Sequence, residues 1–483
     1  MNRITRGEGM KSKRLQLVFS SLSLTLLACL GVGCSNGELF EDQATGQAID
    51  KTSMDSPPAK IHIQFAQWSV PSTKFIEEAI TRFNENNNSN IQIDFLNIPL
   101  DRYIETLNKL NASGSGPDVF ELPREWLNSY ITKEWVSDLS SSISPAFISS
   151  FPDWAVNSSK ELIDSQGRIY SLPSNQITYR LIYNKDLFRE SGLDPDSPPR
   201  TFSELVKAAQ LISSNEIGRS KYGIAMPMGE EWMDFVQPME AINGYSGVHF
   251  YDFKSGKYDL TVYKPWLKTI KELNENGGVF PGMENMKSSQ AMAQFADGNI
   301  GMMIASSWQA SLLFDQFSPK NDWGIALPPA IDNARVGKGA IKVDTAGWNV
   351  VNSGTPYPKE AAKVWEFLYS DEYIGPLFAH SSMIPIMNSQ ANDLAKPTAT
   401  SRFREFLPGS NDSVYPDTPL ILEEWSRKKI YREAVAGNQD DPSLLEESSR
   451  LNTLLDVAVT SMTIDINHYY FPGFNPLKPM DHK

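Results

Sequence analysis

The sequence predicts an α/β protein in which strands and helices alternate, with enough chain for two lobes. Segments with alternating apolar residues recur about every thirty residues, with helical segments between them, which is typical of parallel βαβ units. The chain has 483 residues, more than a single hydrophobic core usually accommodates. Hydrophobic residues make up 41% of the chain and aromatic residues 11%, so two sizeable cores can be filled.

The first expected elements lie within residues 61–121. Residues 61–69 and 91–95 alternate apolar and polar side chains as half-buried strands do, and a third short strand is expected at 118–121. Apolar residues at helical spacing predict helices near 71–83 and 99–110, each opened by a proline, which suits a first helical turn. Because ligands bind beyond the carboxyl ends of the strands in open α/β sheets, we expect a site at the ends of these strands.

The remaining elements follow from the same patterns. They are a buried strand at 181–184, a helix from the capping box of Thr201 and Glu204 to 212, a helix at 286–295, strands at 300–305 and 323–327, a hairpin at 339–351, and helices at 358–369, 420–435 and 444–459.

Residues 1–34 are typical of a bacterial lipoprotein export signal. A basic segment precedes an uncharged, mostly apolar run that is too short for a transmembrane helix. We favour Cys34 as the lipidated residue, because Gly33 precedes it and polar residues follow. Cys29 is the alternative, with the better residue three places upstream, and an ordinary secretory signal is a third possibility. Residues 35–60 are polar and lack apolar periodicity, which predicts a flexible tether.

Charge and cysteine content exclude several classes of function. The net charge is -14, and the first 33 residues contribute +4, which leaves a mature chain near -18 that repels nucleic acid. The two cysteines precede or form the processing site, so no disulfide, cysteine metal site or cysteine nucleophile is expected. The five histidines are isolated, and neither a nucleophile elbow nor a phosphate-binding loop occurs. We therefore expect no catalysis, no cofactor and no metal.

Several short stretches in a fixed order resemble the extracellular solute-binding proteins of ABC sugar importers, which include maltodextrin- and oligosaccharide-binding proteins. These stretches are 83–86, 112–119, 170–173, 181–188, 192–193, 199–202, 295–303, 347–348, 361–368 and 384–385.

The resemblance implies a two-lobe fold of the periplasmic-binding-protein kind, each lobe a sheet flanked by helices, that closes on a ligand by hinge motion. It places lobe 1 at 61–174 and 327–382 and lobe 2 at 175–326 and 383–483, with crossings near 173–176, 325–328 and 382–385. It also implies a monomer that delivers its solute to membrane permease subunits. The tail after Thr463 extends beyond the family pattern, and it either packs on its own lobe or contacts a partner.

A sugar needs flat aromatic surfaces for stacking and planar polar groups for paired hydrogen bonds. Trp135, Trp323 and Trp365 fit core patterns and are assigned to packing. Trp126 has a packing alternative on its own helix, and Asp118 has the alternative of anchoring its strand. The candidate ligand-binding residues are the aromatic Trp308, Trp348, Trp68, Trp232 and Trp126, and the polar Gln67, Glu121, Asn175, Arg180, Asp118 and Asp344.

The leading hypothesis is a carbohydrate receptor of an ABC importer, lipid-anchored at the outer face of the cytoplasmic membrane. The second is a binding protein for a non-sugar solute, such as a polyamine, a phosphorylated glycerol or a peptide fragment. The third is a surface glycoside hydrolase or lyase, which would release products from a glycan that a receptor leaves intact.

Overall fold

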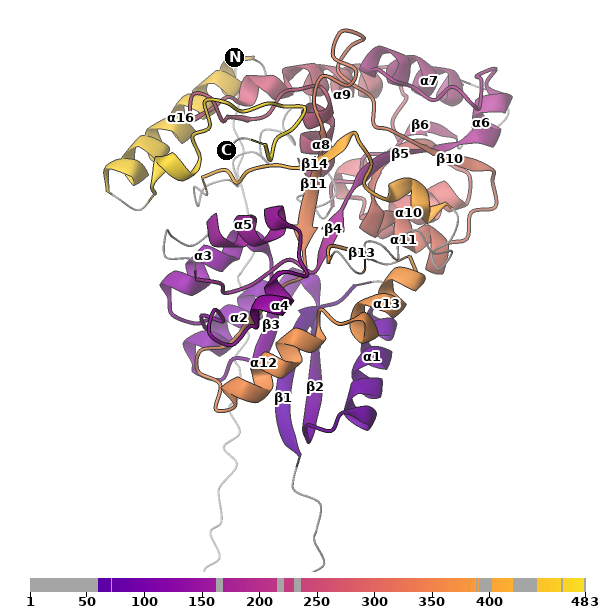
Figure 1. Ribbon diagram of the computed structural model, residues 1–483. Helices are drawn as coiled ribbons and strands as arrows, with labels where there is room; N and C mark the ends of the chain where they lie inside the picture. The colour runs from indigo at the N-terminus through magenta and orange to yellow at the C-terminus, as the bar shows by residue number, and fades with distance from the viewer. Residues whose placement is uncertain are drawn as a thin grey trace, which may run out of the picture. The chain divides into compact units, whose positions relative to one another are not determined.

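The computed structural model describes residues 60–70, 72–161, 168–214, 221–229, 236–381, 383–387, 390, 402–419, 441–461 and 464–481 (Figure 1). These residues belong to one unit, Pro58–Lys483. The expected export signal, nearly all of the tether and the helix expected at 420–435 lie outside the described residues. Within the described part, no helix is both long and apolar enough to span a bilayer.

The first lobe is built on a four-stranded sheet in the order β12-β3-β1-β2. Strands β1 (Ile61–Trp68), β2 (Ile91–Ile98) and β3 (Val119–Leu122) are parallel, and β12 (Trp348–Val351) runs antiparallel beside β3. Helices α1 (Thr73–Asn86), α12 (Pro358–Phe367) and α13 (Asp371–Ala379) pack on one face of the sheet, and α2 (Tyr103–Ala112) and α3 (Arg124–Thr132) on the other. The expected parallel sheet is confirmed.

The break between α1 and β2 has a local cause. The Asn87 side chain donates from Nδ2 to the Phe83 carbonyl and accepts at Oδ1 from the Ile91 amide, so one amide group ends the helix and starts the strand. Asn90 adopts a left-handed backbone with φ of 59°, which asparagine tolerates better than most residues. This asparagine-rich connection therefore fixes how β2 enters the sheet.

The second lobe is built on the sheet β10-β5-β9-β6. Its strands are β5 (Tyr179–Asn184), β6 (Tyr222–Ile224), β9 (Ile300–Ser306) and β10 (Trp323–Ala326). All residues of β5 and β9 are buried, and alternate residues of β9 enter two different cores: Met302 and Ile304 face one cluster, Met303 and Ala305 the other. Burial on both faces explains the continuous apolar runs in the sequence.

Helices on both faces supply these two cores. One face carries α7 (Phe202–Ser214), α8 (Gln237–Tyr245), α9 (Lys264–Glu275) and α16 (Asp441–Thr460), and the other carries α10 (Ser288–Ala296) and α11 (Ser307–Asp315). The smaller elements are η1 (Leu100–Arg102), α4 (Pro145–Ile148), α5 (Asp153–Glu161), α6 (Lys185–Glu190), β7 (Tyr251–Asp252), β8 (Lys257–Tyr258), η3 (Leu260–Tyr263), η4 (Met283–Asn285), η5 (Phe403–Phe406) and η6 (Ile466–His468).

A third sheet, β13-β4-β11-β14, lies between the two lobes (Figure 1). It contains β4 (Asn175–Ile177), β11 (Ile341–Ala346), β13 (Ile384–Pro385) and β14 (Asp412–Val414). Strand β11 pairs with β14 through its first half and with β4 through its second half, so it joins parts of the chain that belong to both lobes. Strands β4 and β13 lie where two crossings were expected.

The second crossing lies in β11 and not at the expected 325–328. Strand β10 stays in the second-lobe sheet beside β5, and the amides of Ala330 and Gly339 donate to the carbonyls of Arg200 and Tyr245. Residues 327–340 therefore belong with the second lobe, and the expected boundary at 327 moves to about 341. The hairpin expected at 339–351 is also wrong, because β11 and β12 pair in different sheets on either side of Gly347.

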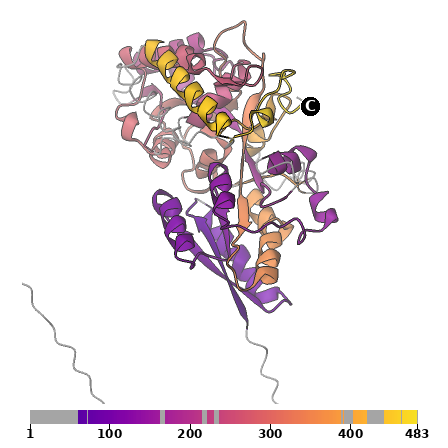
Figure 2. The ribbon, with the colours of Figure 1, turned by 90° about the vertical axis from the view of Figure 1, so that its left-hand side faces the viewer.

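The C-terminal tail packs on its own lobe. Phe471 donates its amide to the Phe253 carbonyl, the Phe474 ring lies 4.6 Å from the Phe253 ring, and the Ala340 amide donates to the Pro476 carbonyl. Helix α16, which precedes the tail, lies against η3 and β8. Figure 2 shows α16 as the long yellow helix of the second lobe. Of the two alternatives left open by the sequence, these contacts match packing on the same lobe.

Candidate functional site

The carboxyl ends of β1 and β3 bring Gln67 and Glu121 together. Gln67 donates to the Glu121 carboxylate, whose Oε1 also accepts the Gly347 amide at 3.0 Å. Tyr373 donates its hydroxyl to Gln67 Oε1 at 3.4 Å. Glu121 is only 3% exposed, and burial raises its pKa from 4.5 to about 7 despite these hydrogen bonds. The two side chains are thus ordered and enclosed at the edge of the first-lobe sheet.

Trp68 and Trp126 are half-buried at the same edge. The Trp68 ring lies edge-on to the Tyr103 ring at 5.3 Å, and Tyr103 donates its hydroxyl to the carbonyls of Ala66 and Glu121. Trp126 is in α3 and packs against the same cluster. Both indoles are supported on one side and partly exposed, as a stacking surface requires.

Trp348 is instead a core residue, which corrects its assignment as a ligand platform. It is fully buried in β12, its indole N–H donates to the Thr345 carbonyl at 3.2 Å, and the Arg124 guanidinium lies 5.1 Å from its ring centroid. The sequence placed Trp348 in an expected hairpin at 339–351, but it pairs with Leu122 inside the first-lobe sheet. Trp323 and Trp365 are also buried, which agrees with their expected packing role.

The second lobe presents Trp308 at the start of α11, directly after β9. The Ser306 hydroxyl accepts the Gln309 amide, and Gln309 Oε1 accepts the Ser306 amide, so a capping box fixes this turn. Ser307 donates its amide to the Thr178 carbonyl, which ties the turn to the chain that enters β5. Trp308 is half-buried while its neighbours on both sides are buried.

Asp344 belongs to a shielded ionic network on β11. Lys342 Nζ lies 2.6 Å from Glu240 Oε2 and 3.2 Å from Asp344 Oδ1, and Tyr179 donates its hydroxyl to Asp344 Oδ2 at 2.6 Å. Burial lowers the pKa of Lys342, but attraction by Asp344 and Glu240 outweighs it, so the net pKa is raised. Sequence reasoning missed Lys342, Glu240 and Tyr179, because partners up to 165 residues apart leave no local pattern.

Arg180 and Asp118 have structural roles, which corrects their assignment to the ligand. All five N–H donors of Arg180 are used: two reach Asp412 at 2.8 Å, and the others reach backbone carbonyls. Asp118 accepts the Gln64 amide and the Thr355 hydroxyl, so it anchors its strand, the alternative that the sequence had left open. Every N–H of Arg180 is therefore engaged within the protein, and each carboxylate oxygen of Asp118 already accepts one hydrogen bond.

The other candidates are less informative. Asn175 is half-buried at the start of β4 and donates from Nδ2 to Ser174 Oγ at 3.2 Å, while Trp232 lies outside the described residues. Among the described residues, no group of three His, Cys, Asp or Glu side chains could hold a metal ion. A surface hollow near α10, lined by Phe280, Met286 and nearby amide side chains, includes none of the expected site residues.

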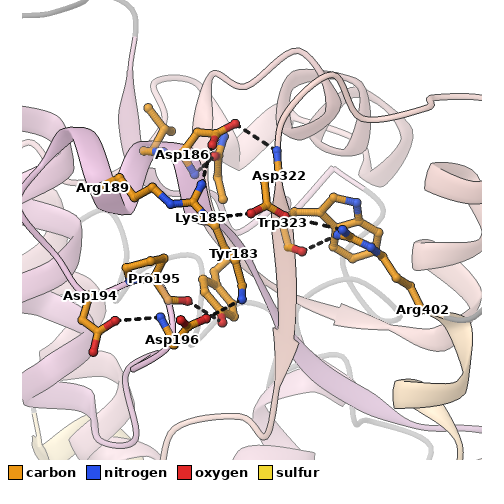
Figure 3. A network of polar contacts seen from close by, with 12 residues as sticks. Tyr183, Lys185, Asp186, Arg189, Asp194, Pro195, Asp196, Asp322, Trp323 and Arg402 are labelled. Atoms are coloured by element: carbon orange, nitrogen blue, oxygen red, sulfur yellow. Dashed lines mark hydrogen bonds and ion pairs between the residues drawn. The ribbon is translucent and has the colours of Figure 1, made fainter.

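A separate charged network marks the opposite end of β5 (Figure 3). Arg189 bridges Asp186 and Asp322, and the Arg402 guanidinium lies 5.0 Å from the Trp323 ring centroid. Lys185 pairs with Asp196 at 2.8 Å. These charged side chains form ion pairs with one another where α6 meets β10. The network therefore stabilises the contact between α6 and the second-lobe sheet, and it is not part of the candidate site.

Comparisons with known proteins agree with this architecture. The chain is 23% identical over 377 residues to a putative binding protein of Brucella abortus, which covers 75% of this chain and 88% of the relative. It is 22% identical over 387 residues to the galactooligosaccharide-binding protein of Bacillus subtilis, covering 76% and 83%. A sn-glycerol-3-phosphate-binding periplasmic protein of Escherichia coli is 25% identical over 259 residues, covering 51% and 55%.

Solved structures show the same two-lobe fold. An ABC transporter solute-binding protein of Thermotoga lettingae bound to α-D-tagatose superposes with a TM-score of 0.67 at 18% identity, covering 82% of this chain and 100% of that one. A maltose-bound protein of T. maritima gives 0.67 at 19% identity, covering 82% and 99%. The pattern of one family matches residues 68–374, well over half of the chain. The chain therefore belongs to the bacterial extracellular solute-binding protein family.

Proposed function

We propose that this protein is the lipid-anchored substrate-binding component of an ABC importer, which captures a sugar or oligosaccharide between its lobes and delivers it to the permease. One observation carries the proposal: partly exposed indoles, Trp68 and Trp126 in one lobe and Trp308 in the other, stand where strands of each sheet end. Indoles on two sides suit a sugar ring, which presents C–H groups on its faces and hydroxyls around its rim. The named ligands of the galactooligosaccharide-binding and maltose-bound relatives support the same class of solute.

A phosphorylated solute is the second candidate, because the glycerol-3-phosphate-binding relative aligns with half of the chain. A phosphate needs cationic donors. The described cations at these edges already have acidic partners: Arg180 binds Asp412, and Lys342 binds Glu240 and Asp344. A polyamine would need available carboxylates, and these same pairings engage three of them, Asp412, Glu240 and Asp344. A neutral solute therefore fits better.

Titration of the purified protein with a glycan panel, followed by calorimetry and tryptophan fluorescence, tests the proposal. We expect Trp308→Ala to weaken glycan affinity by about 10-fold, because one stacking surface is lost. Trp135→Ala is the matched control: Trp135 is also half-buried, but it precedes a bridge at the amino-terminal end of β3, away from the strand exits. Binding of glycerol phosphates or polyamines but of no glycan would refute the sugar assignment.

The anchoring rests on the sequence of residues 1–34, and delivery to a permease rests on the family. We expect Cys34→Ser to abolish incorporation of labelled fatty acid and to release the protein from the membrane fraction, while Cys29→Ser does not. The reverse result would assign the lipid to Cys29. Labelling that persists in the double variant would show that neither cysteine carries it.

A further inference from the structure

Two ion pairs connect residues of the first lobe with residues of the second. Lys74 in α1 places Nζ 2.7 Å from Asp315 Oδ1 at the end of α11. Arg124, the first residue of α3, pairs with Asp417, which follows β14. Helices α1 and α3 lie on opposite sides of the first lobe (Figure 1), so the two contacts flank the crossing strands.

The helix dipoles do not account for these charges. Lys74 and Arg124 lie in the first turns of their helices, where a positive charge is unfavourable, and Asp315 is the last residue of its helix, where a negative charge is unfavourable. Each side chain therefore lowers the stability of its own helix slightly. Lys74 and Arg124 also lie near aromatic rings of their own lobe, 4.6 Å from the Phe75 ring centroid and 5.1 Å from the Trp348 ring centroid. The ion pairs of Lys74 and Arg124 described above, however, are with the other lobe.

The two pairs differ in shielding. The side chains of Arg124 and Asp417 are 21% and 18% exposed, whereas Lys74 is 55% exposed and Asp315 is 18% exposed. Both pairs also sit on elements that carry candidate site residues, because Arg124 follows β3 and Asp315 ends the helix that contains Trp308. A change in lobe arrangement at the site would change both distances.

We propose that these two ion pairs form a salt-sensitive latch that favours the lobe arrangement seen here. Ion pairs of this exposure shift a two-state equilibrium by about 1.5- to 5-fold each, and dissolved salt screens them. The latch has a consequence for solute uptake that rests on the proposed function. Affinity for an uncharged sugar would change with ionic strength, although the sugar itself carries no charge.

The experiment measures the distance between lobes without any solute. Spin labels are attached at the exposed positions Glu78→Cys in α1 and Lys268→Cys in α9 of the full chain in detergent, with Cys29→Ser and Cys34→Ser removing the native thiols. Distance distributions are recorded at about 50 mM and about 500 mM salt. We expect the wild-type distribution to shift with salt, and Asp417→Asn to produce the shift already at low salt.

Further variants separate the latch from local effects. Asp315→Asn combined with Asp417→Asn should shift the distribution most and leave it insensitive to salt. Asp456→Asn is the matched control, because it breaks an exposed pair with Lys257 inside the second lobe, and it should change nothing. Exchanging the charges, with Arg124→Asp and Asp417→Arg together, should restore the wild-type distribution.

The latch would be overturned if Asp417→Asn and the double variant Asp315→Asn/Asp417→Asn each gave the same distance distribution as the wild type at each salt concentration. It would also be overturned if the exchanged pair failed to restore the wild-type distribution. The measurement needs no ligand. A protein that bound no glycan but showed the salt-dependent distance would therefore refute the proposed function and leave the latch standing.

Discussion

The enclosed carboxyl of Glu121 should make folding depend on pH. Its pKa is raised from 4.5 to about 7 because burial favours the neutral form. The carboxyl therefore stabilises the folded state most below pH 4.5, and this contribution is lost as the pH rises through 7. The full difference corresponds to about 3 kcal/mol, of which about 2.5 kcal/mol falls between pH 5 and pH 8.

Glu121→Gln isolates this contribution. Glutamine keeps an oxygen for the Gly347 amide but does not ionise. In urea unfolding followed by circular dichroism, we expect the variant to gain about 2.5 kcal/mol relative to wild type between pH 5 and pH 8, since other titrating groups cancel in the comparison. Glu77→Gln, on the exposed face of α1, is the control and should show no such trend. A constant difference between wild type and Glu121→Gln over this range would refute the reasoning.

Three further predictions concern stability, measured by urea unfolding without ligand. Asp412→Asn should cost about 3–5 kcal/mol, because it leaves a buried guanidinium uncompensated, and a loss below about 1 kcal/mol would contradict this. Gly347→Ala should cost more than about 1 kcal/mol, since φ is 71° and a Cβ would lie 1.8 Å from a serine hydroxyl, whereas Gly375→Ala, with open space around it, should be tolerated. Trp348→Ala should cost about 3–5 kcal/mol, and an unchanged midpoint would remove Trp348 from the core.

Most secondary structure could be predicted because it depends on local patterns. Alternation located β1 and β2, helical spacing located α1, and the capping box of Thr201 and Glu204 located α7. The error at 339–351 has a physical cause. Two adjacent strands joined by a glycine resemble a hairpin, but Gly347 turns the chain from one sheet into another, and pairing partners are not encoded locally.

The candidate site was only partly predictable for the same reason. Trp68 ends β1 and Trp308 comes directly after β9, and their partial exposure was expected from those positions. Arg180 and Trp348 also lie at strand ends. However, Asp412 accepts hydrogen bonds from the Arg180 guanidinium, and Trp348 is buried in the first-lobe core. Whether a polar or aromatic side chain is available depends on neighbours that lie far away in the chain.

By itself, the sequence determined the alternation of strands and helices and the confinement of both cysteines to the first 34 residues, and it located Trp68 and Trp308 near strand ends. The tertiary structure decided that β11 carries the second crossing, that Lys342, Glu240 and Asp344 form one network, and which indoles stay exposed. The physical reason is the separation along the chain over which each effect acts. Periodicity and capping act within a few residues, whereas burial and charge pairing depend on which distant segments the fold brings into contact.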